Sequence, residues 1–410
     1  RDRDRRAAAS AADAAQLAAM QILRETRTGR AVGLVLIALA AATLTGMVLL
    51  WPSGDSESIE VAGIAGETLA AEVTRVEELP CPGAVQESCS QIDVTLDAPP
   101  AGAPETGTIE LGGSNFSPDI DVGDSVRVTA NAAPEGGSAT LSLVDFERRA
   151  PIVWLALAFA GLVLVFGRLR GGLSLIGLAG SLAIVLAFIV PAIAEGSEPV
   201  LVAIVGALAV MLVTIALAHG LGVKSAAAML GTAASLIMVA LLALIFTELA
   251  HLTGFSSEEA TLLASDGSIS VQGLLLAGMV IGALGVLDDV TVSQSSTVIA
   301  LRSANSSMDA RELYRRAIEV GRDHISATVN TLVLAYVGAA LPVLLIFSTG
   351  SVGFGEALNA EVVASEVVAM LVGSIGLIAA VPITTWLATM LAVRLPEDAL
   401  IREAEHGHTH

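Results

Sequence analysis

Long runs of apolar residues, separated by short polar segments, dominate the chain. A helix needs roughly 20 apolar residues to cross a bilayer core, and eight runs meet or approach that length. They cover about residues 31–51, 151–169, 173–194, 199–219, 225–250, 270–300, 325–348 and 367–393. The pattern predicts a polytopic α-helical membrane protein with about eight transmembrane helices, seven of them in a bundle at 151–395.

The pattern changes between the first and second runs, at residues 52–150. Five short alternating segments are divided there by Gly, Pro, Asp and Ser. They read TLAAEVTRVEEL, QIDVTLD, GTIELG, DSVRVTAN and ATLSLVDF. Five strands in so short a stretch predict a small β-rich domain, an OB-like barrel, inserted after the first helix.

The start of the chain differs from a removable signal peptide. Its apolar run exceeds the usual 7–15 residues, and Leu50-Trp51-Pro52 offers no small-residue cleavage site. We therefore expect 31–51 to be an uncleaved anchor helix. Residues 1–30 are expected to form a cytoplasmic helix or a leader without structure, and the absence of an initiator Met leads us to expect further residues upstream.

Composition supports membrane insertion and argues against nucleic-acid binding. The 410 residues are 54% hydrophobic and only 15% charged, with a mean hydropathy of +0.75, whereas soluble domains carry about 25% charged residues. The lipid bilayer is therefore the first expected partner. A net charge of −20 has the wrong sign for phosphate, so no nucleic-acid partner is expected.

The positions of Lys and Arg predict the orientation, because cations near membrane ends stay in the cytoplasm. With the N-terminus inside, 17 of the 21 cations fall on that side. The others are Arg75, Arg127, Arg148 and Arg149, all within the long 52–150 segment. We expect a multi-pass protein of the cell membrane with both termini, including the His-containing tail 396–410, in the cytoplasm and 52–150 outside.

The outer segment carries a net charge of about −14 and both cysteines of the chain. Cys81 and Cys89 are expected to form a disulfide on this oxidising side. Zinc is not expected, because the segment has no histidine. The spacing of Asp119, Asp121 and Asp124 does not match an EF-hand loop, so a solvated acidic face is favoured over a metal site.

Residues 273–301, GLLLAGMVIGALGVLDDVTVSQSSTVIAL, carry the strongest chemical signal. A carboxylate at membrane depth costs roughly 2.5–3.5 kcal/mol by insertion measurements, so Asp288 and Asp289 are functional candidates. Such a group can bind and release a proton. The alternative is that the pair marks a solvated helix end.

Helical spacing adds polar residues to this pair. Asp288 shares a face with Thr291, while Asp289 shares one with Ser293 and Ser296. After an amphipathic segment at 306–321, expected to be a cytoplasmic surface helix or else a packed linker helix, the chain re-enters the membrane with more polar residues. The candidate ion-coupling residues are Asp288, Asp289, Thr291, Ser293, Ser296, Asn330 and Thr331; Asn330 is either a partner of the acids or an interhelical contact.

Sequence motifs of enzymes are missing. The chain has no Gly-rich phosphate loop, no Cys/His metal spacing and no nucleophile elbow. We expect no enzymatic activity, no catalytic residue and no cofactor.

Two motifs, GALGVLDDVTVSQSS and GRDHISATVNTLVLAYVGAALP, resemble the core signature of the YibE/F family of bacterial membrane proteins. The resemblance extends over essentially the whole chain. It implies an anchor helix, a β-rich domain and a helix bundle. In the family pattern one Asp follows GALG after three residues, so a family role would belong to Asp289 first.

A more distant resemblance connects the chain with the RND superfamily of proton-driven transporters, including the SecD/SecF secretion motors. There too a Gly-rich helix with an intramembrane Asp leads through a short amphipathic helix to a polar returning helix. This chain differs in having no second repeat, two extra helices and no lysine within any span, since Lys224 is its only lysine.

These observations favour a secondary transporter or a proton-motive-force-driven membrane machine in which the Asp pair binds H⁺ or Na⁺. Its substrate, whether a small molecule, an ion or a polypeptide, is not identified, and a homo-oligomer remains open. The alternative is a non-transporting scaffold, an assembly or secretion-accessory protein whose outer domain binds a partner.

Overall fold

The computed structural model forms two compact units, each with a hydrophobic core of its own. One contains Arg1–Glu57 with Gly167–His410, and the other contains Ser58–Phe166. The structure describes residues 27–54, 68–80, 88–97, 105–111, 119–131, 140–256, 258–265, 269–350 and 353–395. The predicted leader up to residue 26 and the predicted tail 396–410 lie outside these ranges.

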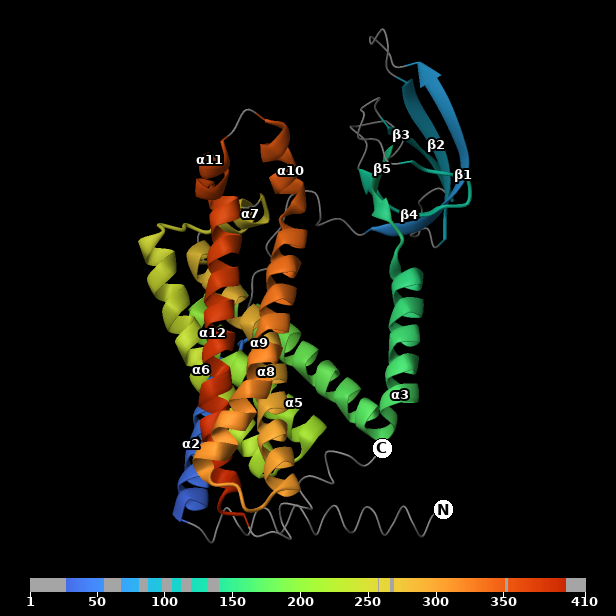
Figure 1. The fold of residues 1–410 in the computed structure, drawn as a ribbon. Coiled ribbons are helices and arrows are strands. Elements are labelled where there is room, and N and C mark those ends of the chain that lie inside the picture. The colour runs from blue at the N-terminus through green and yellow to red at the C-terminus, as the bar shows by residue number, and fades with distance from the viewer. Residues whose placement is uncertain are drawn as a thin grey trace, which may run out of the picture. The chain divides into compact units, whose positions relative to one another are not determined.

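The smaller unit is built on an antiparallel sheet, and the five predicted strands are confirmed (Figure 1). The strands follow the spatial order β3-β2-β1-β4-β5. Their bounds are β1 Leu69–Pro80, β2 Ser88–Leu96, β3 Thr106–Leu111, β4 Ser125–Asn131 and β5 Thr140–Phe146. Each lies where apolar and polar residues alternate, because successive side chains of a strand point to opposite faces.

One face of the sheet is buried and the sheet curls around it. Val73, Val94 and Val126 are among the inward side chains. The register of β1 shifts after Val73, which is a bulge that increases local twist. The two edge strands come into contact: a Cβ added at Gly107 of β3 would lie only 2.2 Å from a side-chain carbon of Leu141 in β5.

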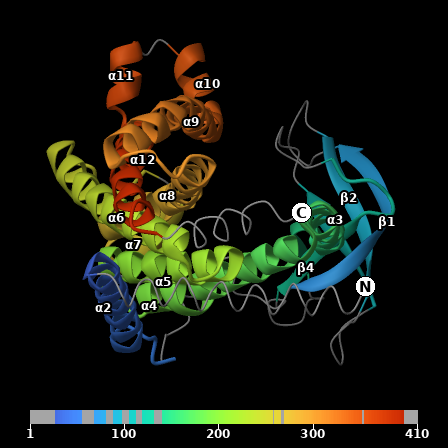
Figure 2. The same cartoon turned by 60° about the horizontal axis from the view of Figure 1, so that its bottom comes forward.

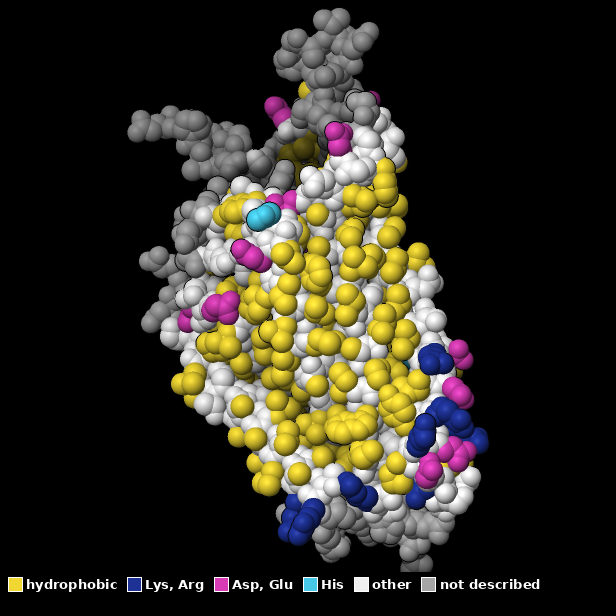
Figure 3. Space-filling model, turned by 60° about the vertical axis from the view of Figure 1, so that its left-hand side comes forward, with side chains coloured by type: hydrophobic (Ala, Val, Ile, Leu, Met, Phe, Trp, Pro, Cys, Tyr) yellow, Lys and Arg dark blue, Asp and Glu magenta, His cyan; other side chains and the backbone are white. Residues whose placement is uncertain are grey.

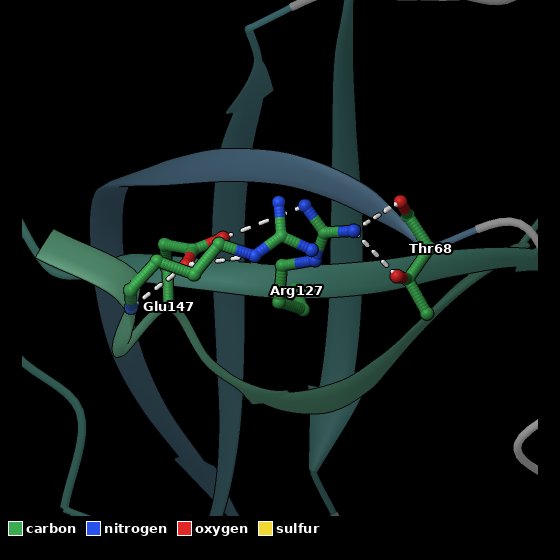
Figure 4. A network of polar contacts seen from close by, with 4 residues as sticks. Thr68, Arg127 and Glu147 are labelled. Atoms are coloured by element: carbon green, nitrogen blue, oxygen red, sulfur yellow. Dashed lines mark hydrogen bonds and ion pairs between the residues drawn. The ribbon is translucent and has the colours of Figure 1, made fainter. Parts of the chain in front are cut away.

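Arg127 ties three parts of this unit together (Figure 4). Its Nη2 donates to the carbonyl and the hydroxyl of Thr68 at 2.7 and 2.6 Å, and its Nη1 lies 3.4 Å from Glu147 Oε2. Glu147 also accepts from the Arg149 N–H at 3.0 Å, where helix α3 (Arg149–Ile184) begins. The network fixes how the chain leaves the sheet and enters the helix.

The larger unit is a helical bundle. Among the described residues, seven helices are long and apolar enough to cross a membrane, and an eighth span results if one bent helix pair counts as a single span. The seven cover Arg27–Leu49, Arg149–Leu169, Gly171–Ala194, Pro199–His219, Val223–Leu249, Val271–Ala304 and Glu361–Ala392; the bent pair is Ala310–Ala339 with Leu341–Thr349. The predicted polytopic helical membrane protein is thereby confirmed.

The helices carry the labels of Figures 1 and 2. Within α3, Arg168 has non-helical angles (φ 50°, ψ −130°) that divide two of the spans. In chain order the others are α2 Arg27–Leu49, the π-helix η1 Val185–Ile189, α4 Val190–Ala194, α5 Pro199–His219, α6 Val223–Leu249, α7 Glu258–Ser265, α8 Val271–Ala304, α9 Ala310–Ala339, α10 Leu341–Thr349, α11 Phe354–Asn359 and α12 Glu361–Ala392.

Helix α9 is continuous where the sequence suggested a surface helix followed by a separate span. It begins at the cap of Asp309, whose side chain accepts from the Glu312 N–H at 2.7 Å, and runs to Ala339. A bend of 62° then leads into α10. Pro342 lies in the first turn of α10 and has no N–H to continue the hydrogen-bond ladder, which explains the bend.

Helix α12 packs against α6, α8 and α9 (Figure 2), and glycines allow the closest approaches. A Cβ at Gly231 of α6 would lie 2.0 Å from Thr384 Oγ1 of α12. A Cβ at Gly376 of α12 would lie 2.2 Å from a methyl carbon of Val239. Close backbone approach is the usual way for helices to associate in lipid, where no hydrophobic force drives them together.

Two carboxylates hold loops of the helical unit. Glu195 accepts from the backbone N–H groups of Ser53 and Gly54 at 2.7 and 2.8 Å. Glu361 accepts from those of Thr253 and Gly254 at 2.7 and 2.6 Å. The bonds from Ser53 and Gly54 lower the pKa of the Glu195 carboxyl below its ordinary value, because they stabilise the ionised form.

Candidate functional site

Asp288 lies in the middle of α8 and points towards α5. Its Oδ2 lies 3.1 Å from Thr214 Oγ1, whereas its Oδ1 is buried and has no hydrogen-bond partner among the described residues. The Thr214 hydroxyl is also 2.9 Å from the carbonyl oxygen of Val210 in its own helix. Since the hydroxyl carries one proton, Asp288 and this carbonyl share a single donor.

One turn further, Thr291 connects α8 with α6. Its side chain is fully buried, and its Oγ1 lies 2.6 Å from Thr232 Oγ1. The same hydroxyl lies 3.1 Å from the Asp288 backbone carbonyl. The hydroxyl pair of Thr291 and Thr232 therefore lies one turn along α8 from Asp288 and is linked to its backbone carbonyl rather than to its carboxylate.

The next turn brings Gln294, which joins α8 to α9 and α12. Its Nε2 donates to Thr385 Oγ1 at 2.7 Å and to the Ala317 carbonyl at 2.9 Å. Thr385 Oγ1 in turn lies 2.6 Å from the Val381 carbonyl. The small Gly321 leaves space for the amide, because a Cβ there would lie 2.9 Å from Gln294 Oε1.

Asp288, Thr291 and Gln294, with their partners Thr214, Thr232 and Thr385, form what we name the polar column. Its three α8 residues are three apart, which places them along one side of the helix. Its side chains supply carboxylate, hydroxyl and amide oxygens, which are groups that bind protons or hard cations. The column contacts four helices: Asp288 reaches α5, Thr291 reaches α6, and Gln294 reaches α9 and α12.

The structure separates the other predicted residues from this column. Asp289 is exposed, and Ser293 and Ser296 are half-buried, with Ser296 Oγ donating to the Val292 carbonyl at 2.8 Å. Asn330 and Thr331 of α9 are exposed, and Thr331 Oγ1 donates to the Ala327 carbonyl at 3.0 Å.

Four residues of the column were not among the predicted site residues. Gln294 belongs to the same DDVTVSQSS segment and follows the three-residue spacing from Asp288, so that spacing could have identified it. The other three are threonines within apolar runs: Thr214 and Thr232 stand alone, and Thr385 follows another threonine. Nothing in those runs distinguishes them from threonines that only bond to their own helix.

The predicted disulfide lies partly outside the described residues. Cys89 is half-buried in β2, whereas Cys81 falls in the segment 81–87, of which the structure describes nothing. The pairing of Cys81 with Cys89 stays a prediction.

Comparison with known proteins gives one match. Residues 155–394, which include every helix of the polar column, match the family described as YibE/F-like protein. No curated protein and no solved structure matches the chain.

Proposed function

The chain belongs to the YibE/F-like protein family, and we propose that it is a secondary transporter or proton-motive-force-driven membrane machine whose coupling ion binds at Asp288. The coupling ion is H⁺ or Na⁺. Asp289 has a secondary role, because it is exposed and has no hydrogen bond to the described residues of the polar column.

The observation that carries this proposal is the incomplete coordination of the Asp288 carboxylate. Its Oδ1 is buried without a protein partner, although nine-tenths or more of buried polar groups in proteins have one. An unpaired carboxylate oxygen at membrane depth is costly. A bound proton or cation removes that cost, and this favours ion binding over a purely structural role.

The Thr214 hydroxyl suits both states of Asp288. When the carboxylate is ionised, the hydroxyl donates its proton to Oδ2 across 3.1 Å. When Asp288 is protonated, the hydroxyl can donate to the Val210 carbonyl instead and accept from the Asp288 O–H. When a cation is bound, the same hydroxyl can turn its lone pair towards the cation. The Thr214 hydroxyl can therefore suit the ionised and the ion-bound forms of Asp288 by turning about its Cβ–Oγ1 bond.

The arrangement of charge supports the orientation that such a machine needs. Figure 3 shows a broad hydrophobic band with the Lys and Arg side chains gathered at one end of the visible face. By the positive-inside rule this end lies in the cytoplasm, which leaves the acidic β-domain outside the cell membrane. Its strand order and the contact between β3 and β5 support an OB-like barrel.

Ion-dependent thermal stability tests the proposal without knowledge of the substrate. A bound ion stabilises the folded protein by RT ln(1 + [ion]/Kd), about 2.7 kcal/mol at one hundred times Kd. We expect the melting temperature of the purified protein to depend on Na⁺, compared with K⁺ at equal ionic strength, or on pH alone if the ion is H⁺. Asp288→Asn should remove the Na⁺ dependence, or the part of the pH dependence that Asp288 contributes, while Asp289→Asn should retain it.

An Asp288→Asn protein that keeps the full ion dependence of the wild type would contradict the proposal. Asp288 would then be a structural acceptor for Thr214. The alternative of a scaffold or secretion-accessory protein, whose outer domain binds a partner, would take its place.

A further inference from the structure

A cavity of about 270 Å³ opens between the start of α9 and the end of α12. We name it the α9–α12 groove. Its walls are formed by Ala310, Arg311, Tyr314, Trp386, Thr389 and Met390. The groove is separate from the polar column, since it shares no residue with it.

The accessible walls of the groove are almost entirely apolar. Trp386 is 54% exposed, and together with Met390 it provides a large apolar surface. Tyr314 adds a second aromatic ring. Tyr and Trp concentrate where a membrane meets water, because one end of each ring system is apolar and the other is polar. The groove has the composition of a membrane interface.

A cation stands at the edge of the groove. Arg311 is exposed and has no ion pair with any residue that the structure describes, whereas Arg316 on the same helix is paired with Glu312 at 2.7 Å. An unpaired guanidinium beside an apolar groove is complementary to a phosphate with attached hydrocarbon. Arginine binds phosphate oxygens through paired N–H donors.

An unsatisfied polar atom lies behind the wall of the groove. Thr389 lines it, is only 1% exposed, and its Oγ1 is buried without a partner in the described part of the chain. The ester or glycerol oxygens of a phospholipid lie between its phosphate and its acyl chains. Rotation of the Thr389 side chain towards the groove would let these oxygens accept from its hydroxyl while the phosphate contacts Arg311.

We propose that the α9–α12 groove binds one anionic phospholipid, with its phosphate on Arg311, its glycerol region against Thr389 and an acyl chain along Trp386 and Met390. The site sits beside an important helix contact. Thr385, next to Trp386, accepts from Gln294, and Ala317 is within one turn of Tyr314. A lipid in the groove braces α9 against α12 where both hold the polar column.

Trp386 is a built-in reporter for this site. The chain has three tryptophans, and Trp51→Phe with Trp154→Phe leaves Trp386 alone. Phe at position 51 retains a ring against Phe188, on which Trp51 stacks at 5.8 Å. The full chain is reconstituted in bilayers of phosphatidylcholine and phosphatidylglycerol, of which one or the other is brominated. Quenching of Trp386 against mole fraction then gives the relative binding constant of the two lipids.

We expect phosphatidylglycerol to bind about fivefold more strongly than phosphatidylcholine, the preference that one Arg near a membrane surface provides. Arg311→Gln should abolish this preference. Arg322→Gln, an exposed Arg of the same helix outside the groove, should retain it. Thr389→Val should weaken the binding of both lipids by roughly two- to tenfold, because it removes one hydrogen bond.

Equal quenching by the two brominated lipids in the reporter protein would overturn the proposal, since it would mean that Trp386 meets only bulk lipid. Equal losses of preference in Arg311→Gln and Arg322→Gln would also overturn it, because a general surface charge would then explain the effect. Neither result depends on ion binding at Asp288.

Discussion

Two neighbouring aspartates have different surroundings because successive helix residues are about 100° apart around the axis. Asp288 meets Thr214 inside the bundle, while Asp289 is exposed. The sequence could predict that an acidic pair lies at membrane depth, and it placed Thr291 beside Asp288. It could not predict which acid faces inward, because all sides of α8 are rich in small or apolar residues.

Acid should release the Glu195 contact with Ser53 and Gly54. The folded-state pKa of Glu195 is lowered from 4.5, so its stabilising effect is complete above that pH and is lost as the pH falls through the lower folded value. Hydrogen exchange at the Ser53 and Gly54 amides, expressed as protection factors, measures how these hydrogen bonds to Glu195 depend on pH. We expect protection at neutral pH that disappears under strongly acidic conditions.

Glu195→Gln is the matched control for this measurement. A carboxamide can still accept from one N–H group but does not titrate, so its weaker protection should be independent of pH. If wild-type protection stayed constant down to strongly acidic pH, the ionised carboxylate would not be what holds the two amides.

At the scale of elements, periodicity predicted most of the fold. The five alternating segments became β1 to β5, and the apolar runs became spans, because each pattern reports directly on what a strand or helix must bury. The continuity of α9 was missed. Its amphipathic first half and apolar second half meet near Gly321, a residue type that often ends helices, but here Gly321 stays helical because α9 packs closely against Gln294 and Val381 there.

The close contact between α6 and α12 gives a stability prediction. Gly231→Ala should lower the free energy of unfolding by roughly 1–3 kcal/mol, because the new Cβ would overlap Thr384, which lies 2.0 Å away at Oγ1. Gly285→Ala in α8 is the control, since a Cβ there meets nothing within 4 Å. It should be neutral or stabilising by up to about 1 kcal/mol, because Ala favours helix more than Gly does.

Unfolding of the two variants in mixed detergent micelles would measure the difference. Equal stabilities of Gly231→Ala and Gly285→Ala would show that α6 and α12 do not approach as closely as the structure indicates. Loss of stability in Gly285→Ala alone would mean that the open side of α8 is covered in the working protein.

At the scale of the whole molecule, the family match and the spans establish a multi-pass membrane protein of the YibE/F-like family. The sequence could predict this class because hydrophobicity is summed over hundreds of residues. It could not predict the polar column, because Thr214, Thr232 and Thr385 are brought to α8 only by tertiary packing. Ion binding at Asp288 is the claim on which the proposed function depends.

The most direct test is infrared difference spectroscopy of the reconstituted protein during changes of pH and Na⁺. We expect a carboxyl band that responds to the coupling ion, is absent in Asp288→Asn and persists in Asp289→Asn. A spectrum in which Asp288→Asn retains that band, or in which Asp289→Asn alone removes it, would contradict ion binding at Asp288 and would leave Asp288 as a fixed acceptor within the bundle.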